Sequence, residues 1–355
     1  MKLFYNGRRH SNHLRTRGGK TMRKLRIATI IFLSLLLAGC LNIGKKNHNT
    51  SSGNGTRVTG RVVFADTPLT LASVVRIGDQ RIQTDTGVFN TTIKSGVHDY
   101  VIETLLGTYT GTVEHQGNQN RLTLIVPAFP GWDPVDYNNI LVNDTENATT
   151  RWPVGKNIKV WIEPPNSKNG IKEKHVEMAW RAFLDWQEAL DSIITFQKVS
   201  SESQADITVR FVPKLRGERG MLIAGECYRS WSRNTKYLQT GKIRINVEHV
   251  YGLFIPDEIG IYRHEVGHCI GLGHSTKEHH LMYYSVGEDN NEITPVEKNL
   301  ARLLYSIQPN TGYIPTHQAA MVTPLSVPTS RIIDYDPETG LVTEVIQSIP
   351  VRSSQ

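Results

Sequence analysis

Hydrophobic positions between residues 151 and 307 follow two different periods. In three short runs, apolar residues recur at every second position, the pattern of strands with one buried face; the runs are residues 151–163, 205–212 and 242–247. Residues 172–190 instead carry apolar side chains three and four positions apart, which predicts a helix with one apolar face. Residues 294–307 have the same spacing, with Thr294 as N-cap and Pro295 at the first helical position. These elements predict one α+β domain over residues 151–307.

Residues 57–128 form a second region with strand periodicity. Its short alternating apolar runs are broken by Gly and Asp, which predicts a small antiparallel β-sandwich. Thr84-Asp85-Thr86-Gly87-Val88-Phe89 and the run around Gly60 resemble the carboxypeptidase regulatory-like, transthyretin-type domain. That resemblance implies an all-β spacer or adhesive support without chemistry of its own.

Three segments lack a clear period. Residues 41–56 are rich in Asn, Ser, Gly and Lys, which predicts a flexible tether. Residues 129–150 are interpreted as a polar linker. The tail, residues 308–355, has Pro, Thr and Ser with two short strand-like runs. Both a segment lying along the preceding domain and a disordered tail fit this pattern.

A further helix is predicted to begin at Pro256, because proline fits the first turn and the acids Asp257 and Glu258 suit a helix N-terminus. It leads into the most informative motif of the chain, His264-Glu265-Val266-Gly267-His268-Cys269-Ile270-Gly271-Leu272-Gly273-His274. Residues four apart share a helix face, so His264 and His268 can direct two ring nitrogens to one metal ion.

The third histidine can join them only if the helix ends. On a continuing helix, His274 would lie roughly 9 Å further along the axis and on another face. Gly271 is placed to end the helix, and Gly273 gives the returning chain further freedom. Three protein ligands leave the fourth zinc position open, which is typical of a catalytic site. The alternative is a helix with a satisfied core histidine and an exposed charged pair.

This motif resembles that of the metzincin clan of zinc endopeptidases, HExxHxxGxxH followed by a methionine turn. Met282, eight residues after His274, corresponds to the turn methionine. Ser275 is similar to the matrixin branch, whereas Tyr284 replaces the usual matrixin proline and is shared with astacins. The resemblance covers about residues 151–307 and implies a zincin fold, a mixed sheet with long helices.

The resemblance also implies roles for particular residues. One zinc ion would be held by His264, His268 and His274, with Glu265 as general base and Met282 beneath the metal. Gly220–Glu226 falls where the family has its edge strand, so the backbone of Ala224 and Gly225 could contact a peptide substrate. The alternative is an ordinary edge strand protected by charges. Tyr284 either approaches the developing oxyanion or walls the substrate side-chain pocket.

Other metal sites are less strongly indicated. The region between Lys214 and Val247 contains no histidine, so we predict no structural zinc of the vertebrate matrixin type. Calcium sites are possible, but no motif indicates them. His279 and His280 are interpreted as solvated loop residues. Cys227 and Cys269 follow Cys40 in the chain, and either a disulfide or two buried thiols fits them.

The N-terminal region, residues 1–40, predicts export. Arg23, Lys24 and Arg26 precede an apolar run, residues 27–37, that is too short for a stable membrane span. Leu37-Ala38-Gly39-Cys40 resembles a bacterial lipobox, which implies lipidation at Cys40 and anchoring to a membrane, the outer one in a two-membraned cell and otherwise the cell surface. The alternative is an ordinary signal peptide with a chance cysteine.

The distribution of charge bears on whether nucleic acid is a partner. The net charge is +7, and residues 1–26 alone carry nine Lys and Arg with no acid. The mature chain is therefore near neutral, and nucleic-acid binding is not implied. We interpret the protein as an exported zinc endopeptidase that acts on proteins or peptides. The alternative is a surface adhesion or binding protein that uses a protease-like scaffold; the oligomeric state is left open.

Overall fold

The structure is a computed structural model that describes residues 55–143, 146–217, 220–250, 253–286, 290–315 and 330–350. The predicted leader, the predicted lipidation site at Cys40 and most of the predicted tether lie outside these residues. Within the described ranges, every helix is too short or too polar to cross a membrane.

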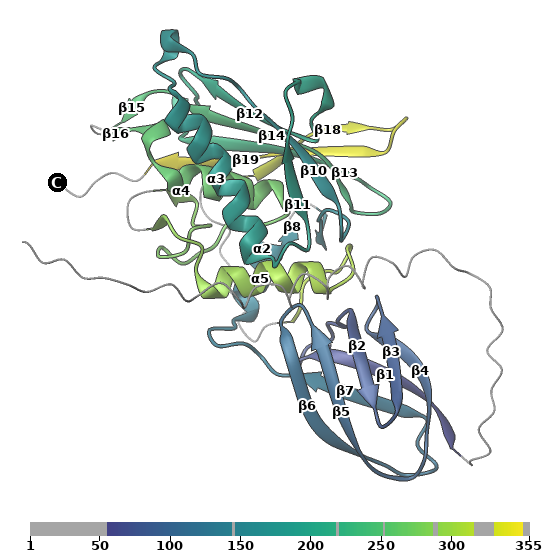
Figure 1. The fold of residues 1–355 in the computed structure, drawn as a ribbon. Coiled ribbons are helices and arrows are strands. Elements are labelled where there is room, and N and C mark those ends of the chain that lie inside the picture. The colour runs from purple at the N-terminus through teal and green to yellow at the C-terminus, as the bar shows by residue number, and fades with distance from the viewer. Residues whose placement is uncertain are drawn as a thin grey trace, which may run out of the picture. The chain divides into compact units, whose positions relative to one another are not determined.

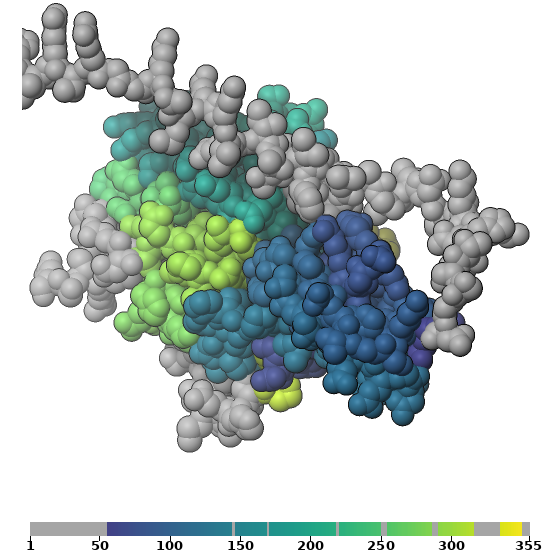
Figure 2. All heavy atoms as spheres, turned by 60° about the horizontal axis from the view of Figure 1, so that its bottom comes forward, coloured from purple at the N-terminus to yellow at the C-terminus, as the bar shows by residue number. Residues whose placement is uncertain are grey.

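Residues 56–126 form seven strands in two sheets. One sheet has the order β4-β1-β7, with bounds β1 (Thr56–Phe64), β4 (Val88–Ile93) and β7 (Arg121–Val126). The other has the order β3-β2-β5-β6, with bounds β2 (Ser73–Ile77), β3 (Gln80–Thr84), β5 (Gly96–Thr104) and β6 (Gly107–His115). Alternate side chains of β1, β4 and β7 are buried, as the sequence period predicts. In the space-filling view, the atoms of these strands form one compact purple-to-blue body (Figure 2).

The segment predicted as a polar linker is instead ordered secondary structure. It contains α2 (Pro134–Leu141), β8 (Val142–Asn143) and β9 (Ala148–Thr149). Asp133 is the N-cap of α2 and accepts a hydrogen bond from the Val135 N–H, 2.9 Å. Tyr137, Ile140 and Leu141 are buried, at a helical spacing that the many polar neighbours obscure.

An eight-stranded mixed sheet organises the rest of the described chain. Its order is β11-β10-β12-β14-β13-β19-β17, with β18 paired to β19 beside this path. The bounds are β10 (Asn157–Ile162), β11 (Thr195–Lys198), β12 (Ile207–Val212), β13 (Gly225–Ser232), β14 (Leu238–Asn246), β17 (Ser285–Val286), β18 (Ser330–Asp336) and β19 (Leu341–Pro350). Strands β10, β11, β12 and β14 are mutually parallel, and β13 is antiparallel to both of its neighbours.

Three helices of this region are close to those predicted. Their bounds are α3 (Glu173–Ala189), α4 (Ile259–Cys269) and α5 (Pro295–Ser306). The apolar face of α3, including Phe183 and Trp186, is buried against the sheet and α4. Helix α5 has the predicted Thr294 cap, completed as a capping box by Glu297.

Short elements join these parts. They are the 3-10 turns η2 (Ser167–Asn169), η3 (Glu202–Gln204) and η5 (Ile255–Asp257), and the hairpin strands β15 (His249–Val250) and β16 (Leu253–Phe254). Pro256 was predicted to begin the helix that carries His264 and His268. It lies instead in η5, and Glu258 is the N-cap of α4. Proline suits the first turn of either helix type, so the residue alone does not distinguish them.

The predicted edge strand is not at an edge of the described sheet. Strand β13 starts at Gly225, and its far side pairs with β19 along residues 341–348. Figure 1 shows the yellow strands β18 and β19 in the same sheet as the teal and green strands β12–β14. The tail was predicted either to lie along the preceding domain or to be disordered. Its described part, residues 330–350, lies along that domain.

Candidate metal centre

Helix α4 carries the motif and ends where the sequence predicts. Its last residue is Cys269, and Gly271 follows with a φ of +118°. A Cβ on Gly271 would lie 2.3 Å from the Thr150 carbonyl oxygen, so neither the conformation nor the space admits a side chain. The Gly273 N–H then donates to the Ile140 carbonyl at 2.6 Å. This sharp return brings His274 back to the face of α4 that carries the other two histidines.

The three histidine rings converge on one point. The Nε2 atoms are 2.9 Å apart for His264 and His268, 3.2 Å for His268 and His274, and 3.3 Å for His264 and His274. In a tetrahedral zinc site with Zn–N bonds of about 2.0–2.1 Å, two ligand nitrogens lie about 3.3 Å apart. The observed triangle therefore fits a zinc ion, and the three residues form a group that could hold a metal ion.

Hydrogen bonds at the other ring nitrogens orient two of these ligands. The Nδ1–H of His264 donates to the Leu281 carbonyl at 2.6 Å, and that of His268 to the Leu272 carbonyl at 2.9 Å. A donating Nδ1 leaves the lone pair on Nε2, which is the atom that faces the triangle. Burial lowers the pKa of His264 to about 4 and those of His268 and His274 well below their usual range. All three rings are therefore neutral and able to coordinate near pH 7.

The methionine turn packs beneath this triangle. A Cβ on Gly267 would lie 2.4 Å from the Met282 sulfur, so the glycine in α4 makes room for the methionine. The Met282 N–H donates to the buried carboxylate of Glu297 at 2.6 Å, and the neighbouring Leu281 carbonyl holds His264. Glu297 thus links α5 to the metal ligands through the turn. The capping box at Thr294 was the sequence signal that could have identified it.

Glu265 lies next to the triangle and is fully buried. Its Oε1 accepts a hydrogen bond from the Ser348 hydroxyl at 2.5 Å, while its Oε2 has no hydrogen-bond partner among the described residues. Burial raises the pKa of the Glu265 carboxyl well above its usual range, and the charge of Glu226 adds to this effect. The Oε2 atom, which has no hydrogen-bond partner among the described residues, is the oxygen that could exchange a proton as a general base and acid.

Gly225 forms the other wall of the Glu265 site. A Cβ at this position would lie 2.6 Å from Glu265 Oε1 and 3.0 Å from Cδ. The glycine therefore permits the close approach of β13 and the carboxylate. Ala224 and Gly225, predicted as substrate contacts, both face β19: Ala224 N–H donates to the Ser348 carbonyl at 2.8 Å, and Gly225 pairs with Ser348.

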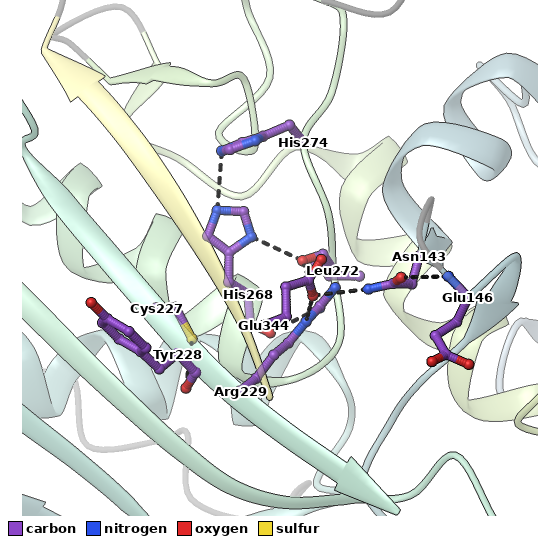
Figure 3. A network of polar contacts seen from close by, with 9 residues as sticks. All are labelled: Asn143, Glu146, Cys227, Tyr228, Arg229, His268, Leu272, His274 and Glu344. Carbon is purple, nitrogen blue, oxygen red and sulfur yellow. Dashed lines mark hydrogen bonds and ion pairs between the residues drawn. The ribbon is translucent and has the colours of Figure 1, made fainter. Parts of the chain in front are cut away.

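A buried ion pair supports the centre from the side of the sheet (Figure 3). Arg229 on β13 donates to Glu344 on β19 at 2.8 Å, and Asn143 also donates to Glu344 at 2.9 Å. Arg229 also donates to the carbonyls of His268 and Leu272, at 3.2 and 3.1 Å. The arginine therefore connects the end of α4 to the C-terminal strand. No sequence motif marks Arg229, Glu344 or Ser348.

Loop residues near the centre differ in part from prediction. His279 is exposed, but His280 is buried and its Nδ1 is 2.8 Å from the Ser275 hydroxyl. Ser275 also accepts from the Lys277 N–H at 3.0 Å, so this cluster fixes the loop before the methionine turn. The Tyr284 carbonyl accepts a hydrogen bond from the Ile349 N–H at 3.1 Å, and its ring packs on Tyr283. The Tyr284 backbone thus contacts β19, and its role toward substrate stays a prediction.

Cys227 and Cys269 are both free and buried, which is the second of the two predicted alternatives. Burial raises the pKa of the Cys227 thiol well above its usual range, with the neighbouring Cys269 as the next cause. The raised pKa leaves little Cys227 thiolate at neutral pH. The pair therefore fills the core between β13 and α4.

The geometry of the centre agrees with one comparison with known proteins. Residues 151–306 match the family model described as matrixin. They form a matrixin-like domain. The matched region is less than half of the chain and includes the three histidines, Glu265 and Met282. Strand β19, which contacts Glu265, lies outside the matrixin-like region.

Two further comparisons add no functional argument for the matrixin-like domain. No curated protein matches the chain. Among solved structures, a GH20 exo β-N-acetylglucosaminidase from Vibrio harveyi in complex with N-acetylglucosamine is 11% identical with a TM-score of 0.21. The similarity covers 82% of this chain and 35% of that enzyme, so the chain spans about a third of its length.

Proposed function

We propose that the matrixin-like domain is a zinc-dependent endopeptidase in which Glu265 is the general base. The observation that carries this proposal is the triangle of His264, His268 and His274 Nε2 atoms beside a buried carboxyl. A zinc ion held by the three rings would polarise the scissile carbonyl and lower the pKa of a water molecule. The match to the matrixin family supports the reaction class.

The residues of the chain then account for the proton transfers. Glu265 takes the proton of the attacking water and returns it to the leaving amine. His264 and His268 stay neutral and oriented because their Nδ1–H groups are bound to the Leu281 and Leu272 carbonyls. The surrounding apolar core, which includes Met282 and Trp186, keeps the dielectric low around the charges that develop.

The test is a Glu265→Ala variant compared with the unchanged chain. We expect the variant to bind about one zinc ion per chain and to lose cleavage of an unfolded protein substrate, since the carboxylate is adjacent to the ligands but not one of them. Metal analysis and a cleavage assay with a chelator control measure the two properties. Full cleavage by the variant, or cleavage that a chelator does not stop, would disprove the proposal.

We also propose that the protein is exported and lipid-anchored at Cys40. The support is the sequence alone: a basic start, a short apolar run and Leu37-Ala38-Gly39-Cys40. Its substrates would then be extracytoplasmic proteins. Mass spectrometry of the mature N-terminus tests this; an unmodified protein that begins at another residue would contradict it.

A further inference from the structure

The C-terminal strand β19 reaches the proposed base from a part of the chain outside the matrixin-like region. We divide it into an anchor segment, residues 341–346, and a site segment, residues 347–350. The anchor segment pairs with β13 on one side and with β18 on the other. The site segment follows directly and lies between the start of β13 and β17.

The site segment is held by main-chain bonds on both sides. The Ser348 carbonyl accepts from the Ala224 N–H at 2.8 Å, and the Ile349 N–H donates to the Tyr284 carbonyl at 3.1 Å. It runs antiparallel to β13 and parallel to β17. Without the site segment, the Ala224 N–H and the Tyr284 carbonyl would be open to an extended peptide that adds beside β13 as a strand. A peptide cannot use them while the site segment does.

The side chains of the site segment also engage the proposed machinery. Ser348 is fully buried and donates to Glu265 Oε1 at 2.5 Å. Gln347 donates to the buried Glu226 carboxylate at 3.0 Å. In a strand, alternate residues share a face, so Ser348 lies on the same face as Glu344 and Ile346. On this face Ser348 reaches Glu265 on α4, and Glu344 reaches Arg229, which bonds to the His268 carbonyl of the same helix.

The anchor segment is built more firmly than the site segment. Glu344 is buried and bonded to both Arg229 and Asn143, and Val342, Val345 and Ile346 are buried. Figure 3 shows Glu344 facing Arg229, which also contacts the Leu272 carbonyl at the end of α4. A segment tethered to such an anchor has an effective concentration of about the millimolar range or more at its own binding position. A free peptide must compete with it.

We infer that the site segment is an intramolecular occupant of the substrate position, which keeps the enzyme inhibited until residues 347–350 are displaced or removed. The occupant is this chain's own tail, and the peptide it excludes is an extended strand. That this occupancy inhibits an enzyme rests on the proposed function. The occupancy itself does not depend on it.

Two shortened chains test the inference. A chain ending at Ile346 lacks the site segment but keeps Glu344 and the anchor. A chain ending at Pro350 lacks only the last five residues and is the matched control, because it keeps every contact named above. The probe is a fluorescent peptide with the sequence of residues 347–355, added to metal-free protein so that cleavage does not interfere. Thermal melting establishes that each chain is folded.

We expect the chain ending at Ile346 to bind the probe at least about tenfold more tightly than the full chain or the chain ending at Pro350. With zinc, its kcat/KM toward an unfolded protein should be at least about tenfold higher. Equal probe binding by all three folded chains would overturn the inference, and so would the absence of probe binding to any of them. Preferential binding without cleavage by any chain would support tail occupancy and count against the proposed endopeptidase alone.

A full-length variant covers the case in which the shortened chain does not fold. Ile349→Pro removes the N–H that binds the Tyr284 carbonyl and leaves the anchor unchanged. We expect it to bind the probe more tightly than the unchanged chain. Unchanged probe binding by this folded variant would also overturn the inference.

Discussion

Replacing Gly225 by alanine places one methyl group against the proposed base. The added Cβ would lie 2.6 Å from Glu265 Oε1 and 3.0 Å from its Cδ and Cγ, where ordinary contacts begin at 3.4 Å. The carboxylate must therefore retreat by about 0.8 Å, and a misplacement of roughly 1 Å costs about a hundredfold in rate. The three heavy atoms nearest to the methyl all belong to Glu265 and none to a histidine, so zinc binding should persist.

The same change has a small effect on stability because two terms oppose each other. Overpacking a filled core costs about 1–3 kcal/mol. Alanine in a strand interior recovers roughly 0.5–1 kcal/mol of the backbone entropy that glycine loses on folding. We therefore expect the free energy of unfolding to fall by about 0–2.5 kcal/mol while kcat/KM falls about a hundredfold.

The assay compares kcat/KM, zinc content and urea unfolding, in the full chain and in the chain ending at Ile346. Gly241→Ala is the matched control, since its Cβ would lie 3.0 Å from the Cys269 sulfur, on the same sheet and helix but away from Glu265. It should lose stability to a similar extent and retain activity. Full activity in Gly225→Ala, or an equal loss of activity in both variants, would refute the reasoning.

Two further predictions concern the supports of the centre. Arg229→Ala should lower the free energy of unfolding by about 3–5 kcal/mol, because it leaves Glu344 buried without its charge partner. Urea unfolding measures this loss, and Arg229→Met combined with Glu344→Leu should recover most of it. The metal-free chain should lose stability as pH falls from about 6.5 toward 4, on the order of 3 kcal/mol from His264 alone. The reason is that burial lowers the pKa of His264 to about 4 in the folded state, so the unfolded state takes up the proton first. Urea unfolding with a chelator at several pH values measures the slope, and a flat profile over this window would contradict it.

Much of the matrixin-like domain follows from local pattern. The helix predicted over residues 172–190 is α3, and the helix predicted over residues 294–307 is α5 with the expected Thr294 cap. The helix break at Gly271 also agrees, because only a glycine accepts both its φ and its contact with Thr150. The helix periods, the cap and the glycine break depend on neighbours within a turn or two, which is the range that a single sequence displays. The contact of Gly271 with Thr150 is a tertiary addition to a break that the local pattern already predicts.

Other features depend on partners far along the chain. The burial of His280 requires Ser275 and the fold of the loop around it, which residue type alone does not reveal. The short apolar set of α2, Tyr137, Ile140 and Leu141, is hidden among polar residues, so the segment reads as a linker until it is packed. In both places the tertiary surroundings override a weak local signal.

By itself, the sequence determined which side chains form the candidate metal site: the spacing of His264, His268 and His274 around one helix turn and one glycine break leaves few other arrangements for the rings. Only the tertiary structure decided what lies against Glu265. Arg229 and Glu344 are 115 residues apart, and strand pairing depends on backbone groups that every residue carries. A strand partner therefore leaves no mark in the residue types of β13, and the position of Ser348 at the proposed base emerges only when the sheet is assembled.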